Sequence, residues 1–180
     1  MKTVTLCGSL RFADAMKSIA LELELHHNMN VLQCVYPSEN IPITEAGREV
    51  LGRSHLQKID LSDAIYVLDL GGYIGEAVQQ EIAYARSKGR EVLFHTHYHT
   101  ERIRRLEALF DEVSHTFQTA PEALVPAKVQ ILTAYMDSGL WLLDYERDER
   151  GEFPKDLKRG ILSQDALYDL ICAIEAFQRQ

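Results

Sequence analysis

The chain of 180 residues has few cysteines, no long apolar run and no excess of basic side chains. Cys7, Cys34 and Cys172 are odd in number, widely spaced and flanked by apolar residues, a pattern that fits neither a disulfide framework nor a zinc motif. We interpret them as buried thiols in a reducing compartment. No apolar run approaches about 20 residues, and the N-terminus carries no signal-peptide segment. We therefore expect a cytoplasmic protein that does not bind or cross a membrane.

The charge balance narrows the class of partner. Acidic side chains outnumber basic ones by 27 to 19, a formal net charge of -8, which opposes binding to nucleic acid polymers and anionic lipids. A small anionic ligand remains compatible, because a phosphate site needs only a few backbone N–H groups and one cation. The composition, 46% apolar and 26% charged, is that of an ordinary globular protein.

Short apolar strands alternate with amphipathic helices in the first part of the chain. Strands are predicted at residues 3–7, 31–35, 64–68 and 92–94, with helices at 12–25, from an N-cap at Thr44 to residue 61, and from 74 to about 87. A polar, proline-bounded loop is predicted at 37–42. This alternation predicts an α/β fold with a doubly wound parallel sheet, a Rossmann- or flavodoxin-like three-layer sandwich. Ligands of such sheets bind beyond the carboxyl ends of the strands.

The rest of the chain is predicted to be mainly helical. We expect a helix at 100–113, a last short strand at 116–118, and a helix over 121–136 with an early break at Pro126. An apolar aromatic segment at 140–145, a charged loop at 146–160 and a final helix capped by Ser163 follow. The predicted domains are therefore an α/β domain over residues 1–118 and a mostly helical C-terminal extension over 119–180, packed on it.

The first candidate motif is Cys7-Gly8-Ser9-Leu10-Arg11, between the first strand and the first helix. Gly8 permits a tight turn, Ser9 offers a hydroxyl and N–H groups at a helix start, and Arg11 can hold an oxyanion. These features suit a phosphate. The alternative is a turn glycine, an N-cap serine and a solvated arginine.

The second candidate motif runs from Asp69 through Gly71-Gly72-Tyr73-Ile74-Gly75 to Glu81. Its glycines allow backbone N–H groups to face a ligand, and the Glu81 carboxylate can face the same loop from the following helix. Partial desolvation of the Glu81 carboxylate would raise its pKa, as acid, base or nucleophile chemistry requires. The alternative is a surface glutamate paired with a cation. The glycine order lacks the dinucleotide fingerprint and no Walker lysine follows, which disfavours NAD binding and ATP hydrolysis.

The segments CGSLR, KIDLSDAIYVLDLGGYIG and EAVQQEIAYARSKGREV, in this order, resemble the nucleoside 2-deoxyribosyltransferase-like family, which includes 2′-deoxynucleoside 5′-phosphate N-hydrolases. The resemblance covers about residues 3–95. It implies that Glu81, within Glu-Ile-Ala-Tyr-Ala, attacks C1′ of the sugar to form a glycosyl-enzyme, which water or a second base then resolves. It also implies that Gly8, Ser9 and Arg11 lie near a 5′-phosphate, and it matches Asp63 to the aspartate of the family.

Two departures from the family pattern bear on activity. Where active members carry an aspartate two helical turns before the equivalent of Asp63, this chain has His55, and the nearest carboxylate is Asp60. Either His55 is the proton donor or the activity is altered. The serine that the family has in the second glycine loop is also absent, which leaves backbone amides and the Tyr73 hydroxyl.

The resulting prediction is cleavage or transfer at the N-glycosidic bond of a nucleoside or nucleoside 5′-monophosphate, with no cofactor and no metal. Asp63 or Asp60 would support the sugar or polarise Glu81, and the resemblance implies a homodimer or higher homo-oligomer. The alternatives are a catalytically silent nucleotide-binding or accessory protein and an interaction protein built on the C-terminal 62 residues. His95, His97 and His99 are interpreted as loop histidines near the ligand edge, with a metal site as the lesser alternative. Trp141, Tyr145 and Phe153 are interpreted as core rather than as a base-stacking pocket.

Overall fold

The computed structural model describes residues 1–38, 40–163 and 165–179. These form two compact units, Met1–His97 and Tyr98–Gln180, and each is described by itself. The division falls within one helix, whereas the sequence analysis ends its α/β domain at residue 118. The predicted packing of the C-terminal extension on that domain stays a prediction.

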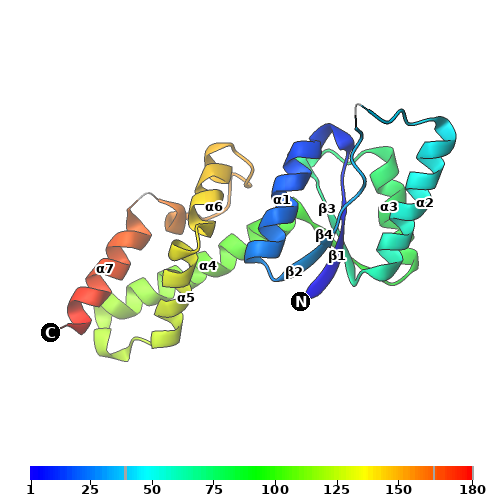
Figure 1. The fold of residues 1–180 in the computed structure, drawn as a ribbon. Helices are drawn as coiled ribbons and strands as arrows, with labels where there is room; N and C mark the ends of the chain where they lie inside the picture. The colour runs from blue at the N-terminus through cyan, green and yellow to red at the C-terminus, as the bar shows by residue number, and fades with distance from the viewer. Residues whose placement is uncertain (39, 164, 180) are drawn as a thin grey trace. The chain divides into compact units, whose positions relative to one another are not determined.

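The first unit contains a sheet of four parallel strands in the order β2-β1-β3-β4 (Figure 1). The strands are β1 (Lys2–Cys7), β2 (Met29–Leu32), β3 (Ala64–Val67) and β4 (Glu91–Phe94). The expected α/β class and the parallel sheet are confirmed. The second strand was predicted two or three residues too late: it follows directly on Asn28, whose positive φ of 52° turns the chain out of the first helix.

Three helices cover the sheet, α1 (Ala13–His26) on one face and α2 (Glu45–Leu61) and α3 (Glu76–Ser87) on the other (Figure 1). The Thr44 hydroxyl accepts a hydrogen bond from the N–H of Gly47, which confirms the predicted N-cap of α2. The predicted 37–42 loop contains Glu39, which lies outside the described residues. Between the sheet and the α2–α3 face the buried core includes Ile59, Val67 and Val78.

The topology places the carboxyl ends of β1 and β3 next to each other. Cys7, the last residue of β1, lies opposite Val67, the last residue of β3. The chain leaves β1 toward β2 on one side and returns to β3 on the other, so the strand order reverses here. In open α/β sheets this is the point where ligands bind.

Helix α4 (His95–Thr119) corrects two predictions. Residues 95–99 are its first turn rather than a loop, and the strand predicted at 116–118 is its last turn. The helix starts directly after β4, where the Asp69 carboxylate accepts a hydrogen bond of 2.9 Å from the N–H of Thr96. No glycine or proline occurs between residues 95 and 119 to interrupt it.

The second unit is helical, with α5 (Pro126–Asp137), α6 (Leu140–Glu149) and α7 (Ala166–Gln178) packed around an apolar core. The segment predicted as an aromatic stretch and the start of the predicted charged loop together form α6. Helix α7 starts at Ala166 with Asp165 at its N-cap, rather than at Ser163. Phe153 is buried in the core and the Trp141 indole donates to the Ile161 carbonyl, which agrees with a structural role for these aromatics.

One buried ionic cluster lies within this unit. The fully buried Asp144 carboxylate accepts from the Tyr135 hydroxyl at 2.8 Å and contacts the guanidinium groups of Arg102 and Arg147. None of the helices in the described part of the chain has the length and apolar character needed to span a membrane.

Candidate active site

A pocket of about 660 Å³ opens in the first unit at the carboxyl end of β1, within the size range of small-molecule sites. Its walls come from four places: the turn after β1, the segment after β2, one face of α2, and the start of α3 with the loop before it. The lining residues on which the following argument depends are Gly8, Ser9, Leu10, Cys34, Arg48, His55, Lys58, Tyr73, Gly75, Glu76 and Glu81.

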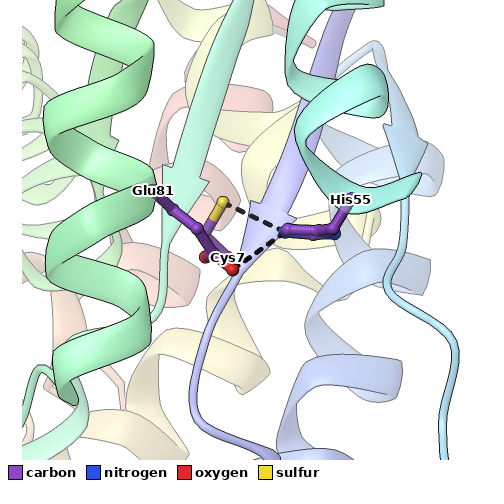
Figure 2. Close-up of side chains that lie close together, drawn as sticks. All are labelled: Cys7, His55 and Glu81. Atoms are coloured by element: carbon purple, nitrogen blue, oxygen red, sulfur yellow. Dashed lines mark hydrogen bonds and ion pairs between the residues drawn. The ribbon is translucent and has the colours of Figure 1, made fainter. Parts of the chain in front are cut away.

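Three side chains from different elements converge at this pocket (Figure 2). The Nε2 atom of His55 on α2 lies 3.5 Å from Oε1 of Glu81 on α3 and 3.6 Å from Sγ of Cys7 at the end of β1. The side chains of His55 and Glu81 are only 10% and 20% exposed. Among the described residues, Oε2 of Glu81 and Nδ1 of His55 are buried and have no partner at ordinary hydrogen-bond geometry, while the Cys7 thiol interacts with the Glu81 carboxylate. Sequence reasoning named Glu81 and His55, and the structure brings them together.

Burial governs the chemistry of the two cysteines nearest the pocket. Burial raises the pKa of the Cys7 thiol well above its usual range, and the negative charge of Glu81 raises it further. Cys7 is therefore a thiol, not a thiolate, at neutral pH. Burial also raises the pKa of Cys34, against the opposing effects of a hydrogen bond from Tyr36 and the charge of Lys58.

The first glycine turn reaches the pocket as predicted. A Cβ on Gly8 would lie 3.1 Å from Cβ of Leu68 and 3.1 Å from Sδ of Met16, so a larger residue would crowd the turn. Ser9 and Leu10 line the pocket, and the Ser9 side chain makes no capping hydrogen bond.

The second glycine loop contributes fewer residues and free amides to the pocket than predicted. Gly71 and Gly72 have positive φ values of 60° and 75°, which explains the need for glycine there. The N–H of Gly72 donates to the Asp69 carbonyl and that of Tyr73 to the Leu70 carbonyl, so these two amides are used inside the turn. Of this loop, Tyr73 and Gly75 line the pocket.

Arg11 binds an aromatic ring in the structure rather than lining the pocket. Its guanidinium lies 4.6 Å from the centre of the Tyr73 ring and 5.2 Å from that of Phe12. The two rings meet edge to face at 6.0 Å. Arg11 therefore joins the first glycine turn to the second by a cation–π contact.

Three aspartates named from the sequence are also absent from the described lining of the pocket. Asp63 lies at the amino end of β3, and its carboxylate accepts a hydrogen bond of 2.8 Å from the N–H of Thr3. The Asp60 carboxylate is exposed and accepts from the Tyr84 hydroxyl. Asp69 holds the start of α4. The structure does not bring these three carboxylates to Glu81.

Two cations on the pocket wall were missed by the sequence analysis. Arg48 and Lys58 line the pocket from α2, and the Lys58 ammonium donates to the Gln33 carbonyl at 2.5 Å. A signal existed: residues 48, 51, 55 and 58 recur at intervals of three and four, one face of a helix, and all four line the pocket. Arg48 is exposed and makes no ion pair with the described residues.

The alternating histidines do not gather on one helix face. His95 and His99 are one turn apart on α4 and buried, whereas His97 is exposed and points about 200° around the helix axis from each. Among the described residues of the first unit, the group with ligand atoms suited to a metal ion is Cys7, His55 and Glu81, all within 4.8 Å of one another.

Comparison with known proteins matches a family model to the second unit. The model of a domain of unknown function, DUF4298, matches residues 103–178, less than half of the chain and wholly outside the pocket. No curated protein and no solved structure matches the chain. None of these comparisons concerns the nucleoside 2-deoxyribosyltransferase-like family, so that resemblance stays a prediction.

Proposed function

We propose that this protein cleaves or transfers at the N-glycosidic bond of a (deoxy)nucleoside or nucleoside 5′-monophosphate, with Glu81 as the nucleophile. The observation that carries the proposal is the Glu81 carboxylate, 20% exposed, on the wall of a nucleotide-sized pocket, with one oxygen 3.5 Å from the His55 imidazole. Partly desolvated carboxylates with a close titratable neighbour concentrate at functional sites.

The reaction follows retaining glycosidase logic. The Glu81 oxygen attacks C1′, the C1′–N bond breaks, and its electron pair stays on the base nitrogen, which takes a proton from His55. Water or a second base then attacks C1′, gives its proton back to the neutral His55 imidazole, and releases the carboxylate. The 3.5 Å contact is shorter than the roughly 5–5.5 Å between the two carboxyl groups of retaining glycosidases. Entry of the sugar therefore requires the side chains of His55 and Glu81 to move apart.

The cations favour the phosphorylated substrate. Arg48 and Lys58 on one wall supply positive charge, and the hydroxyl of Ser9 lines the same pocket. These groups suit a phosphate better than Arg11, which is engaged with Tyr73.

The finer fold assignment is part of the proposal. We assign the first unit to the doubly wound, three-layer class of the Rossmann or flavodoxin type. The strand order β2-β1-β3-β4 and the helices on both faces support it. A cytoplasmic location and a homo-oligomeric state are likewise proposed from the sequence.

The test is release of free base from a panel of nucleosides and nucleoside 5′-monophosphates. We expect Glu81→Ala to abolish release while the fold, followed by circular dichroism, stays intact. Asp60→Asn is the matched control, because it removes a carboxylate that lies on α2 outside the pocket lining. Unchanged turnover in Glu81→Ala would refute the assignment.

One observation favours the alternative of a nucleotide-binding protein without catalysis. The contact with His55 engages an oxygen of the Glu81 nucleophile, and the described pocket lining contains no aspartate that could act as the proton donor. This alternative predicts thermal stabilisation by nucleoside monophosphates without release of base from any of them.

A further inference from the structure

The convergence of a thiol, an imidazole and a carboxylate at the pocket has a second chemical use besides glycoside cleavage. Cys7, His55 and Glu81 come from β1, α2 and α3, and their functional atoms face one another (Figure 2). Each offers one atom that ligates soft or borderline divalent cations, and the atoms in contact are Sγ, Nε2 and Oε1.

Two of the three distances among these atoms match a tetrahedral zinc site, and the third is within 4.8 Å. Bonds of about 2.3 Å to sulfur, 2.05 Å to nitrogen and 2.1 Å to oxygen, at tetrahedral angles, place S and N about 3.6 Å apart and N and O about 3.4 Å apart. The structure has 3.6 Å between Cys7 Sγ and His55 Nε2, and 3.5 Å between His55 Nε2 and Glu81 Oε1. An ion can therefore bind without a change in either of these two interatomic distances.

We propose that Cys7, His55 and Glu81 form a Zn²⁺ site that blocks the nucleophile. Two of these ligands, His55 and Glu81, line the pocket, so water or a ligand atom from the pocket can take the fourth coordination position. Thiolate and imidazole select Zn²⁺ over Mg²⁺ and Ca²⁺, which prefer sets of oxygen ligands.

The charge balance supports the site. Binding displaces the proton of the Cys7 thiol to solvent, and the ion with one thiolate, one carboxylate and one neutral imidazole has a net charge of zero. The Glu81 carboxylate, only 20% exposed, gains a strong electrostatic partner in the ion. Metal binding thus stabilises a charge in a poorly solvated place.

The regulatory consequence rests on the proposed function. Coordination uses the Glu81 oxygen that would attack C1′ and the His55 nitrogen that would protonate the base. Zn²⁺ and the substrate therefore exclude one another, and a chelator restores activity.

The direct test is titration of the chelator-stripped full-length protein with Co²⁺, which reports thiolate ligation by a charge-transfer absorption, followed by displacement with Zn²⁺. We expect one equivalent bound, loss of the charge-transfer band in Cys7→Ser, and affinity lowered at least about tenfold in His55→Gln and Glu81→Gln. Cys34→Ser, in the same pocket, and Cys172→Ser, on the exposed surface, are the matched thiol controls and should keep the band.

The outcomes separate the two proposals. Absence of the band in the wild-type protein, or its loss in Cys34→Ser with retention in Cys7→Ser, overturns the metal site and leaves a hydrogen-bonded trio. Circular dichroism and thermal melting of each variant show whether a lost band reflects misfolding, and His55→Gln supplies a second variant if Cys7→Ser fails to fold. If the wild-type protein releases no base from any nucleotide, the proposed function fails while the Co²⁺ titration still decides the metal site.

Discussion

Replacement of His55 by glutamine tests whether this imidazole protonates the leaving base. Glutamine keeps an N–H donor within reach of Glu81, so the carboxylate retains a hydrogen-bond partner. It cannot transfer a proton in the way imidazole does. The substitution therefore separates proton donation from the positioning of Glu81.

The expected loss follows from the geometry. General acid catalysis contributes about 10²–10⁴ in rate, or about 3–5 kcal/mol of barrier. His55 is 8% exposed with Nε2 3.5 Å from Glu81 Oε1, so bulk water has little access to replace it. Other titratable side chains on the pocket wall include Lys58, whose ammonium donates to the Gln33 carbonyl, and Tyr73 and Glu76, which are exposed. We expect the full loss to appear in His55→Gln and only a small part of it in Glu76→Gln.

The assay compares two substrates. One carries a natural base, and the other is a deoxyribosyl compound whose leaving group departs without protonation. His55→Gln should lose about 10²–10⁴ in kcat on the first and little on the second, a difference that a merely structural role would not produce. Equal losses on both substrates, or a larger loss in Glu76→Gln, would refute the assignment of His55 as the donor.

Three further predictions concern the pocket and the stability of each unit. Arg48→Ala should raise KM for a nucleoside monophosphate about 10- to 100-fold, because a hydrogen bond to a charged group is worth about 1.5–3 kcal/mol. In the same steady-state assay, KM for the unphosphorylated nucleoside should stay unchanged in Arg48→Ala. Arg11→Ala should leave KM for the monophosphate unchanged. Asp144→Ala should lower the free energy of unfolding by about 3–5 kcal/mol, since it leaves two guanidinium groups without their buried partner; Glu112→Ala, which breaks an exposed pair, should lower it by at most about 1 kcal/mol in the same urea titration. Burial raises the pKa of Tyr36 to about 12, above its ordinary value near 10, so its stabilising contribution is complete below about pH 10 and is lost as pH rises toward 12. Tyr36→Phe should flatten that part of the stability profile, and an unchanged slope would contradict the assignment.

Sequence patterns predicted local structure best where one short-range rule decides it. The N-cap at Thr44 depends on a hydroxyl three residues from an N–H, and the strand from Ala64 depends on an unbroken apolar run. The helix predicted at 100–113 is confirmed, but it runs from His95 to Thr119, and its start was missed because the polar and aromatic residues there resemble a loop. Its start is held by Asp69, which is 27 residues away and leaves no local trace.

Of the residues named from the sequence, Glu81, His55 and the first glycine turn lie at the pocket, whereas Arg11 and three aspartates do not, because long-range contacts decide their positions. Glu81 lies on the helix that follows the second glycine loop, six residues after Gly75, and this short spacing is visible in the sequence. The contact of Cys7 with His55 joins residues 48 positions apart and depends on the order of the strands. Arg11 was assigned to an anion because arginine after a glycine turn suits phosphate, but the Tyr73 ring, 62 residues later in the chain, binds it instead.

The single face of α2 also suggests how a nucleotide would lie in the pocket. Arg48 precedes His55 by seven residues, about 10 Å along the helix axis, and both side chains line the same wall. A phosphate at Arg48 and a leaving base at His55 would place the sugar between them, where Glu81 reaches from α3. A nucleoside without its phosphate leaves Arg48 unengaged and loses this alignment. Binding energy from the remote phosphate would then appear in kcat as well as in KM, because it holds C1′ against the nucleophile. If phosphorylation of the substrate changed KM alone, the phosphate would contribute to affinity but not to this alignment.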